Sequence, residues 1–142
     1  MAAERSAKRL GRLLRVRTLQ LGLVQAQESA AHAKLDSEAA LTRRIAQLAD
    51  DVAPRAADTA LGTGLAAAAH YRERLHASAA TAQARVAAAQ AGVERARSAT
   101  QEARRDQSAM EKLMLRARGE AVVREMRALE EAPPSRKRHD PC

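Results

Sequence analysis

Residues 65–121 read LAAAAHYRERLHASAATAQARVAAAQAGVERARSATQEARRDQSAMEKLMLRARGEA. Positions that alternate by four and three residues, counted from residue 61, are apolar at fifteen of eighteen places. They are Leu61, Leu65, Ala68, Arg72, Leu75, Ala79, Ala82, Val86, Ala89, Val93, Ala96, Thr100, Ala103, Gln107, Met110, Met114, Ala117 and Ala121. A helix that buries one narrow stripe against another helix has this spacing. The stretch therefore predicts one side of a coiled-coil seam, and its many alanines predict a close approach of the partner helix.

The partner helix is predicted within the same chain. Residues 10–52 carry a similar stripe, which is apolar at nine of thirteen positions. Its members are Leu10, Leu14, Arg17, Leu21, Val24, Glu28, Ala31, Leu35, Glu38, Thr42, Ile45, Ala49 and Val52. Pro54, Gly62 and Gly64 lie where the first stripe gives way to the second, and residues of these types favour a turn over a continuous helix. The two stripes therefore predict an antiparallel hairpin.

These signals define the expected organisation of the whole chain. We expect one hairpin over residues 1–132, with helix one at about 4–52, a reversal at about 53–64 and helix two at about 65–131. Pro133 and Pro134 cannot continue a helix, so residues 133–142 are expected to form a disordered basic tail.

Composition supports the same fold class. The chain has 142 residues, no Phe, no Trp and a single tyrosine, Tyr71, so large aromatic side chains cannot fill a globular core. About a quarter of the residues are Ala, and most others are strong helix formers. The sequence therefore predicts an all-α protein made of two long helices that form an antiparallel coiled-coil hairpin.

Charge and cysteine content restrict the partners and the compartment. The net charge of +8 favours an acidic partner, which could be a nucleic acid, a membrane surface or a protein. Nucleic acid is disfavoured because single-strand binders stack bases on aromatic side chains. The one cysteine, Cys142, forms no internal disulfide, and the sequence has neither a signal-peptide run nor a membrane span. We expect a cytoplasmic protein that does not insert into a membrane.

The residues that usually carry chemistry show no useful pattern. The histidines His32, His70, His76 and His139 do not form a metal-type pair on one helix face, and no phosphate loop or nucleophile motif is present. We therefore expect no enzyme activity, no metal, no cofactor and no small-molecule substrate.

Several apolar residues lie off the two stripes, where a two-helix seam cannot bury them. They are Leu13, Val16, Leu19 and Leu23 near the N-terminus, Leu113, Leu115, Val123, Met126 and Leu129 near the C-terminus, and Leu41, Leu48 and Tyr71 near the reversal. Two explanations fit these residues. Either they widen the seam or pack against a third helix from a self-associated copy, or they form a surface for another protein. Both interpretations remain open at the level of sequence.

The chain also resembles the flagellar FliJ family. The similar features are the run Arg9-Leu10-Gly11-Arg12-Leu13-Leu14-Arg15-Val16-Arg17, the segment Gln25-Ala26-Gln27, the mid-chain break and the segment Ala109-Met110-Glu111-Lys112-Leu113. The family forms an antiparallel two-helix coiled coil, similar to the stalk of rotary ATPases. It serves flagellar type III protein export. The resemblance implies three partners, which are the hexameric export ATPase, export chaperones and the export gate membrane protein.

The resemblance also implies two sets of contact residues. The open end of the hairpin, where both termini lie, would contact the ATPase through Leu10, Arg12, Leu13, Arg15, Val16, Leu113, Arg116, Arg118 and Val123. The reversal end would contact the gate and chaperones through Leu41, Ile45, Leu48, Val52, Tyr71 and Leu75. Ser78 and Ala82 continue the second pattern but are smaller or more polar than its usual residues.

The expected function is thus a non-enzymatic stalk or escort component of flagellar export, located in the cytoplasm and peripherally associated with the inner membrane. Two alternatives are a self-associating structural coiled coil and a basic hairpin that binds nucleic acid, for which affinity would fall steeply with salt.

Overall fold

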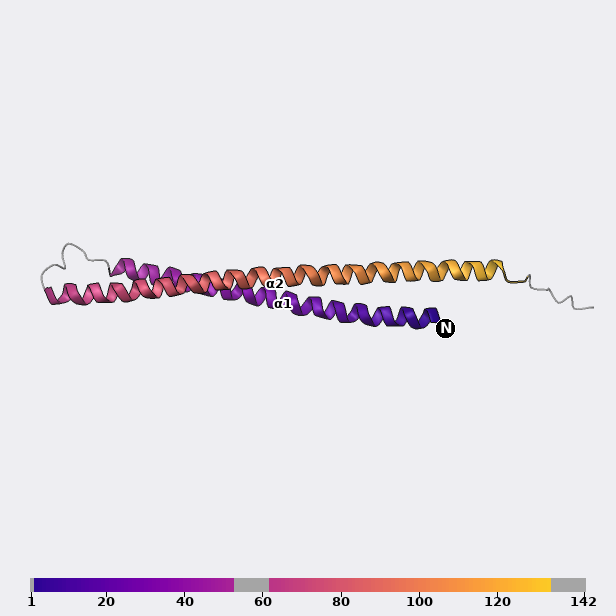
Figure 1. Cartoon of the computed structure of the whole chain (residues 1–142), viewed down its shortest axis with the longest axis horizontal. Helices are drawn as coiled ribbons and strands as arrows, with labels where there is room; N and C mark the ends of the chain where they lie inside the picture. Colours follow the sequence, from indigo (N-terminus) through magenta and orange to yellow (C-terminus); the bar gives the residue numbers. More distant parts are fainter. Residues whose placement is uncertain (1, 53–61, 134–142) are drawn as a thin grey trace, which may run out of the picture. The chain divides into compact units, whose positions relative to one another are not determined.

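The computed structural model describes residues 2–52 and 62–133, and two long helices account for nearly all of them. Helix α1 runs from Ala2 to Asp51 and helix α2 from Gly62 to Glu130 (Figure 1). The predicted helices at about 4–52 and 65–131 are therefore confirmed, with ends that differ by one to three residues. Most of the predicted reversal and nearly all of the predicted tail lie outside the described residues, as do His139 and Cys142.

The two helices contribute jointly to two compact units. The first unit holds residues 1–20 and 103–142, and the second holds residues 21–102. In the first unit, Leu10 of α1 shares a groove with Met114 of α2. Closer to the C-terminal end of α1, the Thr18 hydroxyl accepts a hydrogen bond from Gln107 of α2. In the second unit, the Thr100 hydroxyl approaches the Val24 carbonyl, whereas Leu41 shares a groove with Ala82. Residue numbers rise along one helix as they fall along the other, so the pairing is antiparallel and the predicted hairpin is confirmed.

Burial follows the predicted seam closely. Every seam position of α2 from Ala68 to Ala121 is buried or half-buried, and so is every seam position of α1 except Arg17. Half-burial outside the two stripes occurs only at small residues among those described, namely Gly11, Ala39, Gly92 and Ala99. The 4–3 spacing in the sequence therefore predicts which side of each helix faces the other.

Two seam predictions are wrong. Leu65 is 41% exposed, because α1 ends at Asp51 and does not extend far enough to cover the first turns of α2. Arg17 is exposed because burying a guanidinium in an apolar seam is costly, so its long side chain leaves the seam and places the charge in water. Leu61 lies outside the described residues.

The core is thin and is concentrated in the second unit. The buried side chains of the described residues are Leu75, Ala82, Ala89, Val93 and Thr100, and all of them belong to that unit. The Thr100 hydroxyl donates to the Ala96 carbonyl at 3.1 Å, so its burial leaves no unsatisfied donor. Two other seam residues are less well satisfied, since Glu38 Oε2 and Arg72 Nε are buried without a hydrogen-bond partner.

Candidate protein-binding edges of the hairpin

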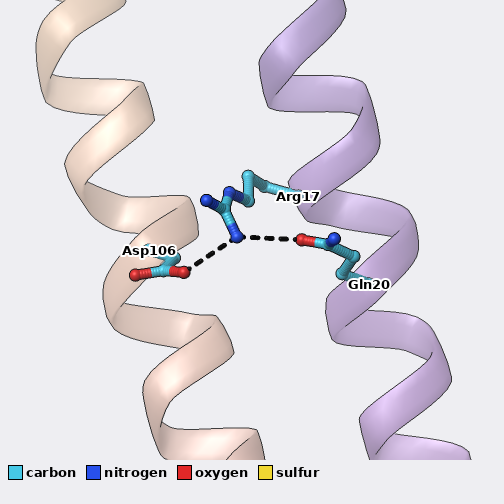
Figure 2. Close-up of polar contacts among 3 residues, drawn as sticks. All are labelled: Arg17, Gln20 and Asp106. Atoms are coloured by element: carbon cyan, nitrogen blue, oxygen red, sulfur yellow. Dashed lines mark hydrogen bonds and ion pairs between the residues drawn. The ribbon is translucent and has the colours of Figure 1, made fainter.

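Polar contacts between side chains define how residues face each other in the first unit. Arg17 Nη1 lies 3.0 Å from Asp106 Oδ2 on α2 and donates to Gln20 Oε1 at 3.0 Å (Figure 2). Asp106 and Gln20 therefore flank the seam on the same side. Moving one heptad along each helix toward the start of α1 leads from Gln20 to Leu13 and from Asp106 to Leu113. Because a heptad returns to the same side of a coiled-coil helix, Leu13 and Leu113 face each other across the seam.

This side of the first unit is an apolar surface flanked by charged side chains of both signs, which we call the open-end edge. Leu13 and Leu113 are 45% and 46% exposed although they flank the seam. Helical spacing places Val16 beside Leu13 and Arg116 beside Leu113, and both of these side chains are exposed as well. Val123 continues the same side of α2 and shares a shallow groove with Arg116 and Glu120. The edge is thus suited to an apolar surface that also carries charged groups.

The remaining residues predicted at the open end do not all belong to this edge. Leu10 is half-buried in the seam, where it shares a groove of about 550 Å³ with Met114 and Arg118. Arg118 and Arg15 occur at helix positions on the other side of the seam, and Arg12 lies on the outer face of α1. The structure therefore brings together Leu13, Val16, Leu113, Arg116 and Val123, and it separates Arg12, Arg15 and Arg118 from them.

The residues predicted at the reversal end belong to one edge of the second unit. Leu41 and Leu48 flank the seam on α1, and Tyr71 flanks it on α2 at the equivalent heptad position. Equivalent positions of two antiparallel helices lie on the same side of their seam, so these three exposed side chains share what we call the reversal-end edge. Ile45, Val52 and Leu75 lie in the seam beneath them, and Leu75 is buried.

A shallow groove lies along this edge. It is lined by Leu41 and Ile45 from α1 and by Ser78, Ala82 and Arg85 from α2. Ser78 and Ala82 have small side chains, which leave room for the groove between the helices at this point. The groove could accept an apolar side chain from a partner, with Arg85 available to a carboxylate.

The apolar residues predicted to lie off the seam are all exposed, which confirms that the hairpin does not bury them. Val122 is a further exposed apolar residue off the seam, and the sequence analysis did not identify it. Its spacing of seven residues from both Leu115 and Leu129 is the signal that could have identified it.

Other kinds of site are not seen in the described part of the chain. No group of three or more His, Cys, Asp or Glu side chains within residues 2–52 and 62–133 could hold a metal ion. Neither α1 nor α2, over the same residues, has an apolar segment long enough to cross a bilayer. No protein-family model, curated protein or solved structure matches the chain.

Proposed function

We propose that this chain is a non-enzymatic stalk or escort protein of the flagellar type III export apparatus, or of a related export system. The observation that carries the proposal is the open-end edge, where Leu13 and Leu113 face each other and stay almost half exposed. A hairpin that functioned only as a spacer would have no use for large apolar side chains beside its seam. The resemblance to the FliJ family supplies the identity of the partner.

In this proposal the open-end edge binds the hexameric export ATPase. The apolar centre at Leu13, Val16, Leu113 and Val123 contributes buried area, and Arg116 attracts acidic groups at the rim. Arg12, Arg15 and Arg118 carry positive charge on other sides of the same unit, so a ring that surrounds the hairpin would meet a basic side chain in several directions.

The proposed mechanism is differential binding. A two-helix stalk has no rotational symmetry that matches six subunits, so it contacts the ring interfaces unequally. A ligand that binds one conformation better than another shifts the population toward that conformation. The stalk would thereby bias some ring interfaces and couple hydrolysis to export.

The reversal-end edge is proposed to bind the export gate and export chaperones. It has exposed Leu41, Leu48 and Tyr71 and the groove beside Ile45, so it can hold a helix or strand of moderate apolar character. A protein with these two edges would work in the cytoplasm, peripherally associated with the inner membrane, without a cofactor or a small-molecule substrate.

The test is stimulation of the cognate export ATPase by the purified chain. We expect the wild type to bind the ATPase and to raise its rate of hydrolysis, and we expect Leu13→Asp or Leu113→Asp to remove most of the stimulation. Each substitution puts a carboxylate at the centre of the proposed contact, where desolvation is unfavourable. Leu19→Asp is the matched control, because Leu19 is exposed on the outer face of α1 and belongs to neither edge.

Circular dichroism should show that all three variants stay helical, since the substituted side chains are exposed. The proposal fails if the wild type neither binds nor stimulates the ATPase. If Leu19→Asp is as damaging as Leu13→Asp, the ATPase contact does not lie at the open-end edge.

A further inference from the structure

A second heptad stripe follows the back of α2 in the first unit. It consists of Leu115, Gly119, Val122, Met126 and Leu129, with spacings of four, three, four and three residues. This is the spacing of a coiled-coil seam, but the actual seam of this helix runs through Met114, Ala117 and Ala121. We call the second series the outer stripe.

The hairpin makes no use of the outer stripe. Leu115 is 65% exposed, Val122 54%, Met126 56% and Leu129 76%. Isolated exposed apolar residues are common, but four large ones on one helix face at heptad spacing form a continuous surface.

Gly119 is the one small residue of the outer stripe. A glycine inside a helix costs about 1 kcal/mol relative to alanine, so it normally has a steric reason. A Cβ atom built on Gly119 would meet nothing within 4 Å, as is also true of Gly11, Gly22 and Gly64. The hairpin therefore does not require this glycine, whereas a second helix lying on the outer stripe could approach closely at this point.

The charges beside the stripe indicate which helix would fit. Arg118 and Glu125 flank the stripe on the same side, seven residues apart, and so occupy equivalent positions. When two copies of this helix pair antiparallel, such positions face each other, and Arg118 of each copy lies beside Glu125 of the other. A two-fold axis repeats the ion pair, so the surface is complementary to itself.

The same charges disfavour a parallel pair. In a parallel coiled coil, the residue just before one core position faces the residue just after the next core position of the other helix. Glu125 would then lie beside Glu130 of the other copy, and the two carboxylates would repel each other. Arg118 would lie beside Val123 and lose its ion pair, so only the pair of Arg116 with Glu111 would remain attractive. In the antiparallel register, Leu115 packs against Met126 of the second copy, and Val122 packs into the notch at Gly119.

We propose that the outer stripe is a self-association surface, on which the C-terminal part of α2 pairs antiparallel with the same segment of a second copy of this chain. The surface lies behind the seam, so α1 stays in place in each copy. The interface uses a short segment, and two of its layers contain Gly119, so the dimer forms reversibly and depends on concentration.

The experiment is analytical ultracentrifugation of the full chain over a range of concentrations, with Cys142→Ser to exclude disulfide dimers. We expect the wild type to change from monomer to dimer as concentration rises. Leu115→Gln with Met126→Gln should weaken the dimer by about tenfold or more, since each large apolar side chain contributes substantially when buried. Gln is a good helix former, so α2 should remain helical. Leu19→Gln is the control and should leave the dimer unchanged.

A charge swap tests the orientation. Arg118→Glu alone and Glu125→Arg alone each place like charges together twice and should weaken the dimer several-fold. The double variant Arg118→Glu with Glu125→Arg restores opposite charges in the antiparallel pair and should recover the wild-type dissociation constant.

A wild type that stays monomeric at every concentration would overturn the proposal, as would a dimer that does not respond to Leu115→Gln with Met126→Gln. Failure of the double charge variant to recover would overturn the antiparallel arrangement. These measurements use the chain alone, so their outcome is independent of whether the export ATPase is its partner.

Discussion

Arg17 and Asp106 form an ion pair between the two helices, with 3.0 Å between Nη1 and Oδ2, although the heptad spacing places Arg17 in the seam. Their side chains are 44% and 52% exposed, so water screens the interaction. The guanidinium of this seam residue therefore lies at the edge of the seam, where it pairs with the Asp106 carboxylate (Figure 2).

Removing this ion pair should have little effect on stability. We expect Asp106→Ala to lower the free energy of unfolding by less than about 1 kcal/mol, and the difference should shrink in high salt. Urea unfolding followed by circular dichroism at low and high salt measures both effects. A loss of several kcal/mol that persists in high salt would mean that the pair is far more strongly coupled to the fold than its exposure indicates.

Small side chains are buried in the seam of the second unit, so this seam should be sensitive to their enlargement. Ala89 is buried in the seam, whereas Ala91, two residues away, is exposed. Ala89→Leu should destabilise the hairpin by about 1–3 kcal/mol, because the helices have to separate to admit the larger side chain. Ala91→Leu is the matched control and should change stability by less than about 0.5 kcal/mol. Equal effects of the two substitutions would contradict the observed register.

The buried carboxylate of Glu38 in the seam should lower the free energy of unfolding of the hairpin. Its Oε2 atom is buried without a hydrogen-bond partner in the described structure. Glu38→Leu should raise the free energy of unfolding by about 1 kcal/mol or more, since it removes the desolvated carboxylate and adds apolar burial. The exposed Glu94→Leu should be nearly neutral. A lower melting temperature for Glu38→Leu would indicate that the carboxylate has a stabilising partner in solution.

The two units should differ in local stability. All five buried side chains among the described residues belong to the second unit. The pairing of the helices in the first unit is therefore stabilised by less apolar burial. Hydrogen exchange should therefore be faster for backbone amides of α1 around Leu10 and of α2 around Met114 than for those around Val93. Similar exchange rates in both units would mean that half-buried seam residues stabilise the pairing as well as buried ones do.

The reversal-end edge can be tested separately from the open end. If it binds the export gate, Leu48→Asp should remove binding to the cytoplasmic part of the gate protein in a pull-down assay, because the new carboxylate would be desolvated in the contact. Ala46→Asp is the control, since Ala46 is exposed on the other side of the seam. ATPase stimulation should survive both substitutions. Loss of gate binding in Ala46→Asp as well would place the contact elsewhere.

The amino-acid sequence by itself determined the helices and the side of each helix that faces the other. Both follow from local properties, namely helix propensity and a 4–3 apolar spacing maintained over many turns. The stripe from Ala68 to Ala121 contains all the described α2 residues that lose solvent exposure except Gly92 and Ala99. The exposed leucines off the stripe were predictable for the same reason, because a two-helix seam has no second layer.

Only the tertiary structure decided which exposed residues act together. Leu13 and Leu113 are a hundred residues apart in the sequence. Whether they face each other depends on the register of the two antiparallel helices. A shift of one heptad would change that register and still bury the same two stripes. The same register leaves Leu65 uncovered beyond the end of α1, and packing rather than periodicity turned Arg17 out of the seam toward Asp106. A repeating apolar pattern specifies a face but not a longitudinal position, and the position was set by side-chain packing and by the polar contacts of Thr18, Thr100 and Arg17.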